Sequence, residues 1–161
     1  MPLAEIAVTD PLVETWEIHD RINLYLLRAL KPTHLELAPP TRGRTVGETF
    51  AHLHNVRLMW LKAASPARLK SLEKLEKDGA ADRARIETSL RESGAAIAAL
   101  VGESLEAGGK LKGFKPHVHA FVGYLVSHES HHRGQIMLAL KHGGAAVPKT
   151  VAYGLWEWGS R

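Results

Sequence analysis

Four long segments of the chain repeat their apolar residues at helical spacing, and no convincing strand pattern interrupts them. Asp10 followed by Pro11 forms a helix start, and Thr45 with Glu48 has the form of a capping box. The last two segments each stop at a pair of glycines. This organisation predicts an all-α four-helix bundle. The predicted helices span residues 11–31, 46–64, 85–107 and 116–142.

The rest of the chain is predicted to connect or cover this bundle. At 161 residues, the length fits a single domain over 1–161. Residues 67–83 place lysine and glutamate at helical spacings, which predicts a short solvated surface helix or lid. The tail over 147–161 is expected to pack on the bundle, with Trp156 and Trp158 docked as packing residues.

Composition removes several classes of function. Because the chain has no cysteine, any metal ligands must be histidine or carboxylate side chains, and a cytoplasmic location is expected. Residues 1–10 lack the features of a secretory leader, and no apolar run is long enough to span a bilayer. The net charge of +4 is spread along the chain, so nothing indicates a nucleic-acid surface.

Histidine is concentrated in the last predicted helix, which with its start holds six of the ten histidines. The run SHESHHRGQI contains H-E-x-x-H, which places His128 and His132 one turn apart on one helix face. Such a pair can hold one metal ion if a facing helix supplies a third ligand. The second helix offers His52 and His54 on opposite sides of its apolar face, so periodicity leaves this choice open.

Other polar residues surround the histidine pair on the helix. Tyr124 and Gln135 fall on the same stripe, whereas Glu129 and Arg133 lie to one side. Its place in the motif makes Glu129 a candidate general base. Tyr124, one turn before His128 on the same stripe, is a candidate pocket residue. The alternative interpretation is that these histidines are hydrogen-bonded core residues or lie at a dimer surface.

A zinc peptidase does not fit the residues that follow the motif. A metzincin-type continuation requires a third histidine at position 138 and a glycine at position 135, where this chain has Leu138 and Gln135. The next acid, Glu157, lies in the tail beyond two glycines and a proline. The motif therefore indicates a metal site of another kind.

The run LVSHESHHRGQI with its GG stop, preceded by TVGETFAHLHNVRLMWL, resembles the DinB-like family and its YfiT-type relatives. The resemblance implies a four-helix bundle, often a homodimer, that holds a divalent ion with three histidines. His52 followed by Leu53, Trp60 and Leu61 matches the family spacing, so the implied ligands are His52, His128 and His132. His54 is then a neighbour of the site.

The resemblance also sets expectations for chemistry. Family members suggest thiol-cofactor transferases, isomerases and hydrolases, so we expect Zn²⁺ or Ni²⁺ and a small-molecule substrate, such as a low-molecular-weight thiol. We expect Arg133, Gln135 and His54 to lie beside the ligands, and Tyr124, from its place on the helix stripe, to line the pocket. The alternative is a non-catalytic metal-binding module that acts in a stress response or binds a ligand. Arg57 departs from the family pattern, because many relatives carry an acid there.

Overall fold

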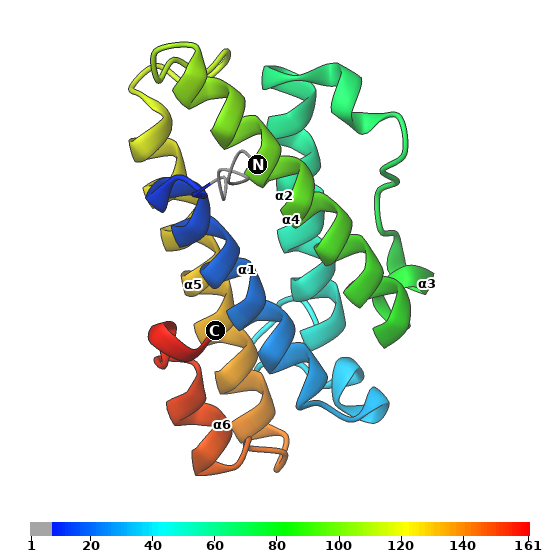
Figure 1. Ribbon diagram of the computed structural model, residues 1–161. Coiled ribbons are helices and arrows are strands. Elements are labelled where there is room, and N and C mark those ends of the chain that lie inside the picture. The colour runs from blue at the N-terminus through cyan, green and yellow to red at the C-terminus, as the bar shows by residue number, and fades with distance from the viewer. Residues whose placement is uncertain (1–7) are drawn as a thin grey trace, which may run out of the picture.

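The computed structural model describes residues 8–161 and confirms an all-α fold (Figure 1). The four bundle helices are α1 (Pro11–Arg28), α2 (Val46–Ala64), α4 (Arg83–Glu106) and α5 (Val118–His142). Two short helices are α3 (Lys77–Ala80) and α6 (Lys149–Gly154), and 3-10 turns span Pro32–Glu36, Pro66–Leu69 and Trp158–Ser160. No helix within 8–161 has the length and apolar character needed to cross a membrane. Residues 1–7, which bear on the predicted lack of a leader, lie outside the described part.

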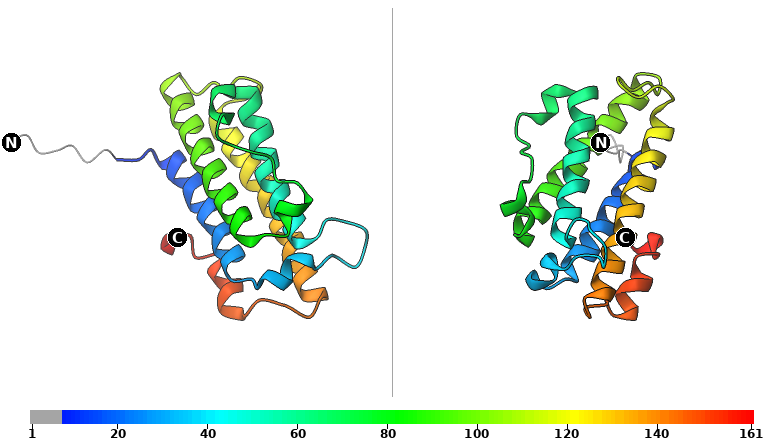
Figure 2. Two further views of the ribbon diagram at one scale, coloured as in Figure 1. Left: turned by 90° about the vertical axis from the view of Figure 1, so that its right-hand side faces the viewer. Right: turned by 180° about the vertical axis from the view of Figure 1, so that it is seen from behind.

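Helices that follow each other in the chain are not all neighbours in the bundle. Helix α1 packs against α4 and α5, and α2 packs against the same two helices. In the views of Figures 1 and 2, α1 and α5 run in one direction, and α2 and α4 run in the other. Because α2 and α4 are parallel, residues 65–82 must carry the chain back along the outside of the bundle.

Local hydrogen bonds account for where the first two helices begin. The Asp10 carboxylate accepts a hydrogen bond from the Leu12 amide at 2.7 Å. At the start of α2, the Thr45 hydroxyl accepts from the Glu48 amide at 3.1 Å, and the Glu48 carboxylate accepts from the Thr45 amide at 2.9 Å. These bonds satisfy amides that a helix start leaves without partners, so both predicted starts are confirmed.

We call residues 65–82 the return segment. It is not the surface helix that its charges predicted. Between the turn Pro66–Leu69 and α3, residues 70–76 are non-helical. The Asn55 side chain bonds both the amide and the carbonyl of Leu75, each at 2.9 Å, and His54 Nε2–H donates to the Glu73 carbonyl at 2.8 Å. Side chains of α2 thus supply hydrogen bonds to backbone groups that would otherwise bond within a helix. Leu75 itself is buried.

The tail packs on the bundle, but one of its two tryptophans does not. Leu155 is buried, and Trp158 packs against the core. Trp156 is 81% exposed, so the prediction that it docks on the bundle was wrong. Helix α6 ends at Gly154, so Trp156 lies beyond the helix.

A layer of polar side chains divides the core into two apolar clusters. On α1, Trp16 belongs to one cluster and Ile22 to the other; on α2, Leu61 and Leu53 are divided in the same way. The same division recurs on α4 and α5. Buried between the clusters are the polar residues His19, Asp20, Asn23, His54, Arg57, Ser93 and Glu129.

Candidate metal centre

Three histidines from two helices converge at the level of this polar layer. We call His52 of α2 and His128 and His132 of α5 the histidine cluster. One ring nitrogen from each lies within 4.8 Å of the other two. The His128 and His132 Nε2 atoms are 3.1 Å apart, and the His52 ring lies edge-on to the His132 ring at 4.6 Å between centroids.

The donor set suits one divalent ion. Two nitrogens bound tetrahedrally to the same zinc lie about 3.3 Å apart, close to the spacing of the two α5 nitrogens. The remaining ring nitrogen of His132, Nδ1, lies 2.8 Å from the Gln135 amide oxygen. Since an amide oxygen only accepts, Nδ1 carries the proton and Nε2 is left free to bind a metal. Among the described residues, no hydrogen-bond partner reaches the buried His128 Nδ1.

The environment keeps these imidazoles neutral. Burial, with the positive charge of Arg44 next in size, lowers the pKa of His52 to about 4. Burial also lowers the pKa of His128 and of His132 below the ordinary value for histidine. Because only the neutral ring binds a metal, the cluster is ready for coordination at neutral pH without first losing protons.

Aromatic side chains cover one side of the cluster. Tyr124 stacks on His128, with an interplanar angle of 14° and 6.1 Å between ring centroids. Trp60 meets Tyr124, Phe114 and Phe121 edge-on, with centroids 5.5–5.7 Å apart. Tyr124 is itself 38% exposed, and His52 and His128 are partly exposed.

Glu129 lies next to His128 in sequence but points into the core. We call His19, Asp20, Asn23, Arg57 and Glu129 the buried polar network. Arg57 Nε donates to Glu129 Oε1 at 2.7 Å, and Arg57 Nη2 donates to Oε2 at 2.9 Å. Arg57 is 0% exposed and also pairs with Asp20 at 2.8 Å. One cation thus pairs with two carboxyl groups in the centre of the bundle.

Helix α1 completes the network around Glu129. His19 Nε2–H and the Asn23 amide donate to Oε2 at 2.9 and 2.7 Å. Asn23 in turn accepts from Arg133 at 2.7 Å. Burial alone would raise the pKa of Glu129, but the Arg57 guanidinium outweighs it and holds the pKa well below its usual range.

Two candidate site residues therefore lie elsewhere. Both Glu129 oxygens accept hydrogen bonds inside the core, so the carboxylate is not directed at the histidine cluster as a general base would be. His54 lies between Ser93 of α4 and the Glu73 carbonyl and is buried, so it fastens the return segment and does not border the cluster. Helical geometry explains both cases, because Glu129 is one residue, about 100°, from His128, and His54 is two residues, about 200°, from His52.

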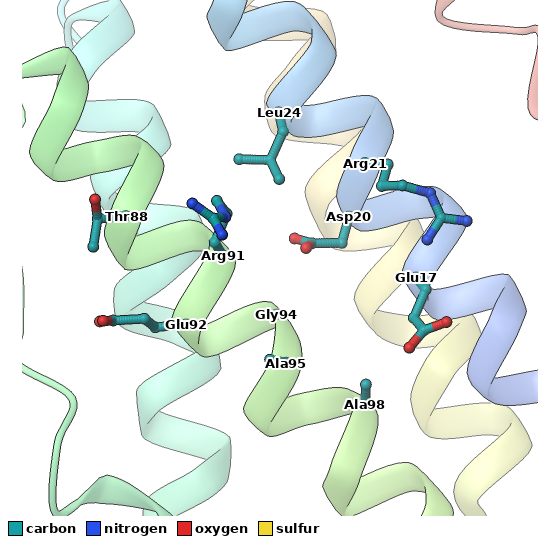
Figure 3. Close-up of a pocket in the computed structure, with 10 residues that line it drawn as sticks. All are labelled: Glu17, Asp20, Arg21, Leu24, Thr88, Arg91, Glu92, Gly94, Ala95 and Ala98. Atoms are coloured by element: carbon teal, nitrogen blue, oxygen red, sulfur yellow. The ribbon is translucent and has the colours of Figure 1, made fainter.

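The network reaches the surface at Asp20. Its carboxylate points from α1 toward Gly94 of α4, at a cavity of about 560 Å³ between the two helices (Figure 3). Burial raises the pKa of Asp20 despite the opposing effect of Arg57. The Gly94 carbonyl accepts from the Trp16 indole at 2.9 Å, so α1 and α4 approach closely at this level.

With the geometry established, the chain can be compared with known proteins. The model of the DinB family matches residues 7–159, nearly the whole chain. The chain belongs to the DinB family. No curated protein and no solved structure matches it. This DinB member therefore has a helical bundle and a three-histidine group compatible with metal binding.

Sequence reasoning missed the α1 half of the network in this DinB protein. His19, Asp20 and Asn23 follow Trp16 at spacings of three, four and seven, so they occupy core positions of an amphipathic helix. Polar residues at such positions were the available signal. Arg44 was also missed, and its place in an irregular connection gave no comparable signal.

Proposed function

We propose that this protein binds one divalent first-row metal ion, zinc or nickel, through His52, His128 and His132, and uses it on a small-molecule substrate. The convergence of three neutral imidazoles at a partly exposed position carries this proposal. Three protein ligands leave a coordination position open, which is the usual distinction between catalytic and structural zinc sites. When bound, the ion would act as a Lewis acid and lower the pKa of a thiol or a water.

The chain's own residues support exchange of a small molecule at this position. Gln135 fixes the tautomer of His132, and Tyr124 shields one side of His128. Low-molecular-weight thiols are the substrate class we favour, in a transferase or hydrolase reaction. The second candidate is a non-catalytic module, in which the ion fastens α2 to α5.

Elemental analysis of tag-free protein tests the proposal. We expect about one ion per chain in the wild type and in His54→Ala, and loss of the ion in His52→Ala and His132→Ala. His54→Ala is the matched control because it removes an imidazole from the same helix outside the cluster. A wild type that stays metal-free after incubation with zinc and nickel at pH 7.5 would falsify the proposal.

A second measurement separates the enzyme from the module. An enzyme loses turnover of thiol substrates in His52→Ala while its fold stays largely intact. A module consumes no thiol, and its melting temperature falls by many degrees when the ion is removed. Thiol consumption and thermal melts of the same samples distinguish the two.

Association of two copies, which the family resemblance implies, stays a prediction. On α5, Leu138 is 55% exposed, and an added Cβ at Gly134, one turn earlier, would meet nothing within 4 Å. This bare face is where we expect a second copy to pack. Light scattering of the wild type and Leu138→Glu tests the prediction.

A further inference from the structure

A cavity beside the histidine cluster joins His52 to an arginine of the connection before α2. The cavity has a volume of about 420 Å³, and both His52 and Arg44 line it. Its far wall is formed by the end of the return segment, including Lys74 and Lys77. We call it the Arg44 cavity. A small molecule at the open coordination position would have this space beside it.

The charges that line the Arg44 cavity are not balanced. Its cations are Arg44, Lys74 and Lys77, and its acids are Glu48 and Glu76. The Glu48 carboxylate caps the start of α2, and Glu76 pairs with Lys74 at 3.2 Å. Among residues 8–161, no ion pair engages Arg44 or Lys77. A metal ion at His52 would add further positive charge.

The positive charge of Arg44 acts on all three proposed metal ligands. Arg44 is exposed, and its charge helps to lower the pKa of His52, His128 and His132. It also lines a second cavity of about 210 Å³, together with Gln135, which bonds His132. A cation that faces three metal ligands and lacks a carboxylate raises the electrostatic cost of a bound metal. An anionic ligand would offset this cost.

We infer that Arg44 binds the carboxylate of an acidic substrate whose other end occupies the open coordination position, so that the site selects acidic small molecules over neutral ones. This inference rests on the proposed function, since it takes the metal at the histidine cluster as given. Guanidinium and carboxylate groups match in a planar pair of hydrogen bonds, which suits recognition of this kind. Because Arg44 is exposed to solvent, the selection is expected to be modest.

A charge series of small thiols tests the inference without measuring turnover. The probes are 3-mercaptopropionate, 2-mercaptoethanol and 2-mercaptoethylamine, which differ mainly in the charge of the group opposite the thiol. Calorimetric titration of zinc-loaded protein at pH 7.5 and low salt gives the Kd of each. We expect the acid to bind about three- to fivefold more tightly than the neutral thiol, and the amine to bind most weakly. Added salt should reduce this preference.

Two variants locate the effect. Arg44→Gln removes the charge and should make the acid and the neutral thiol bind equally well. Arg42→Gln is the matched control, because Arg42 lies in the same connection but does not line the Arg44 cavity, and it should keep the preference. Metal content is measured first, so that all samples carry equal zinc.

The outcomes separate this inference from the proposed function. If the neutral thiol binds but the wild type shows no preference for the acid, the inference is wrong and the metal site stands. Equal loss of the preference in Arg42→Gln and Arg44→Gln would show that the preference depends on the total charge of the connection and not on Arg44, and would also overturn the inference. If zinc-loaded protein binds none of the thiols, the thiol-substrate proposal fails and the inference fails with it.

Discussion

The histidine cluster and the buried polar network share α5 but are built for different purposes. His128 and His132 are brought to a partly exposed position, where their ring nitrogens bond only each other and Gln135 among the described residues. Glu129, between them in sequence, has both oxygens saturated with hydrogen bonds in the core. A site for an exchangeable ligand must remain unsatisfied, whereas a buried charge must be fully paired. One helical motif thus supplies both regions.

The largest effect is expected from breaking the network. Arg57→Met leaves Glu129 and Asp20 as buried carboxylates without their shared cation. Removing one partner of a buried ion pair costs about 3–5 kcal/mol, so we expect a loss of this size in the free energy of unfolding, measured in urea. Arg91→Met is the control, because Arg91 is exposed on α4. A loss below about 1 kcal/mol in Arg57→Met would contradict the assignment.

The second prediction compares how two histidines of α2, His52 and His54, affect stability with and without zinc. Zinc at 100 times its Kd should stabilise the wild type by about 2.7 kcal/mol, and His52→Ala should abolish this gain with little change in the metal-free protein. His54→Ala should keep the gain but lose about 1–3 kcal/mol without metal, because the buried His54 ring bonds both Ser93 and the Glu73 carbonyl. Thermal melts with zinc and with a chelator measure both. If both variants responded in the same way, His52 could not be assigned to metal binding and His54 to the core.

The third prediction concerns the residue that orients His132. Gln135→Ala removes the acceptor that holds the proton on Nδ1, so zinc affinity should fall about 10–100-fold while stability without metal changes little. His131→Ala is the control, since this neighbouring imidazole is exposed and lies outside the cluster. Competition with a chelating dye measures the affinities. Equal affinities of Gln135→Ala and the wild type would show that the hydrogen bond does not support metal binding.

The fourth prediction compares two glycines of α4. A Cβ at Gly94 would collide with the Asp20 carboxylate, whereas the nearest atom to one at Gly102 is a Val13 methyl at 4.0 Å. Overpacking outweighs the gain in helix propensity at the first position, so Gly94→Ala should lose about 1–2 kcal/mol. Gly102→Ala should gain about 0.5–1 kcal/mol. Urea unfolding checks both, and a stable Gly94→Ala would mean that Asp20 is free to move.

Features that depend on residues close together in the chain can be predicted from the sequence. Helix starts depend on residues three apart, so Thr45 with Glu48 predicted the start of α2 correctly. The pairing of His128 with His132 also follows from the local spacing along one helix. The choice of His52 over His54 required the family pattern, because two positions that flank an apolar face are equivalent to a periodicity argument.

Contacts between segments that lie far apart in the chain could not be predicted from the sequence pattern. The conformation of residues 70–76 depends on hydrogen bonds from Asn55 and His54. The charge pattern of the segment does not indicate these partners. The residues next to Glu129 in the sequence do not indicate its hydrogen-bond partners, because those on α1 and α2 lie 72–110 positions away. Trp156 and Trp158 are chemically alike, and only the docking of α6 decides which of them is covered.

The smallest effect is a pH dependence of stability to which the histidine cluster contributes. Because the folded-state pKa values of His52, His128 and His132 are lowered, the metal-free folded protein binds fewer protons than the unfolded chain below pH 6.5. The free energy of unfolding should therefore decrease as pH falls from 6.5 toward about 4, the pKa of His52. Glu129, whose pKa is also lowered, adds its loss only below its ordinary pKa of 4.5.

Partial exposure of the imidazoles screens this effect, so the slope above pH 5 should be shallow. His54, buried elsewhere, contributes with the same sign, so the difference between the wild type and His52→Ala isolates one ligand of the cluster. Urea midpoints of both metal-free proteins at pH 7.5, 6.0 and 5.2 give that difference. A flatter profile in His52→Ala supports an uncharged His52 in the folded state. A steeper one would mean that His52 is protonated and paired in solution, and that the cluster must first release a proton before it can bind metal.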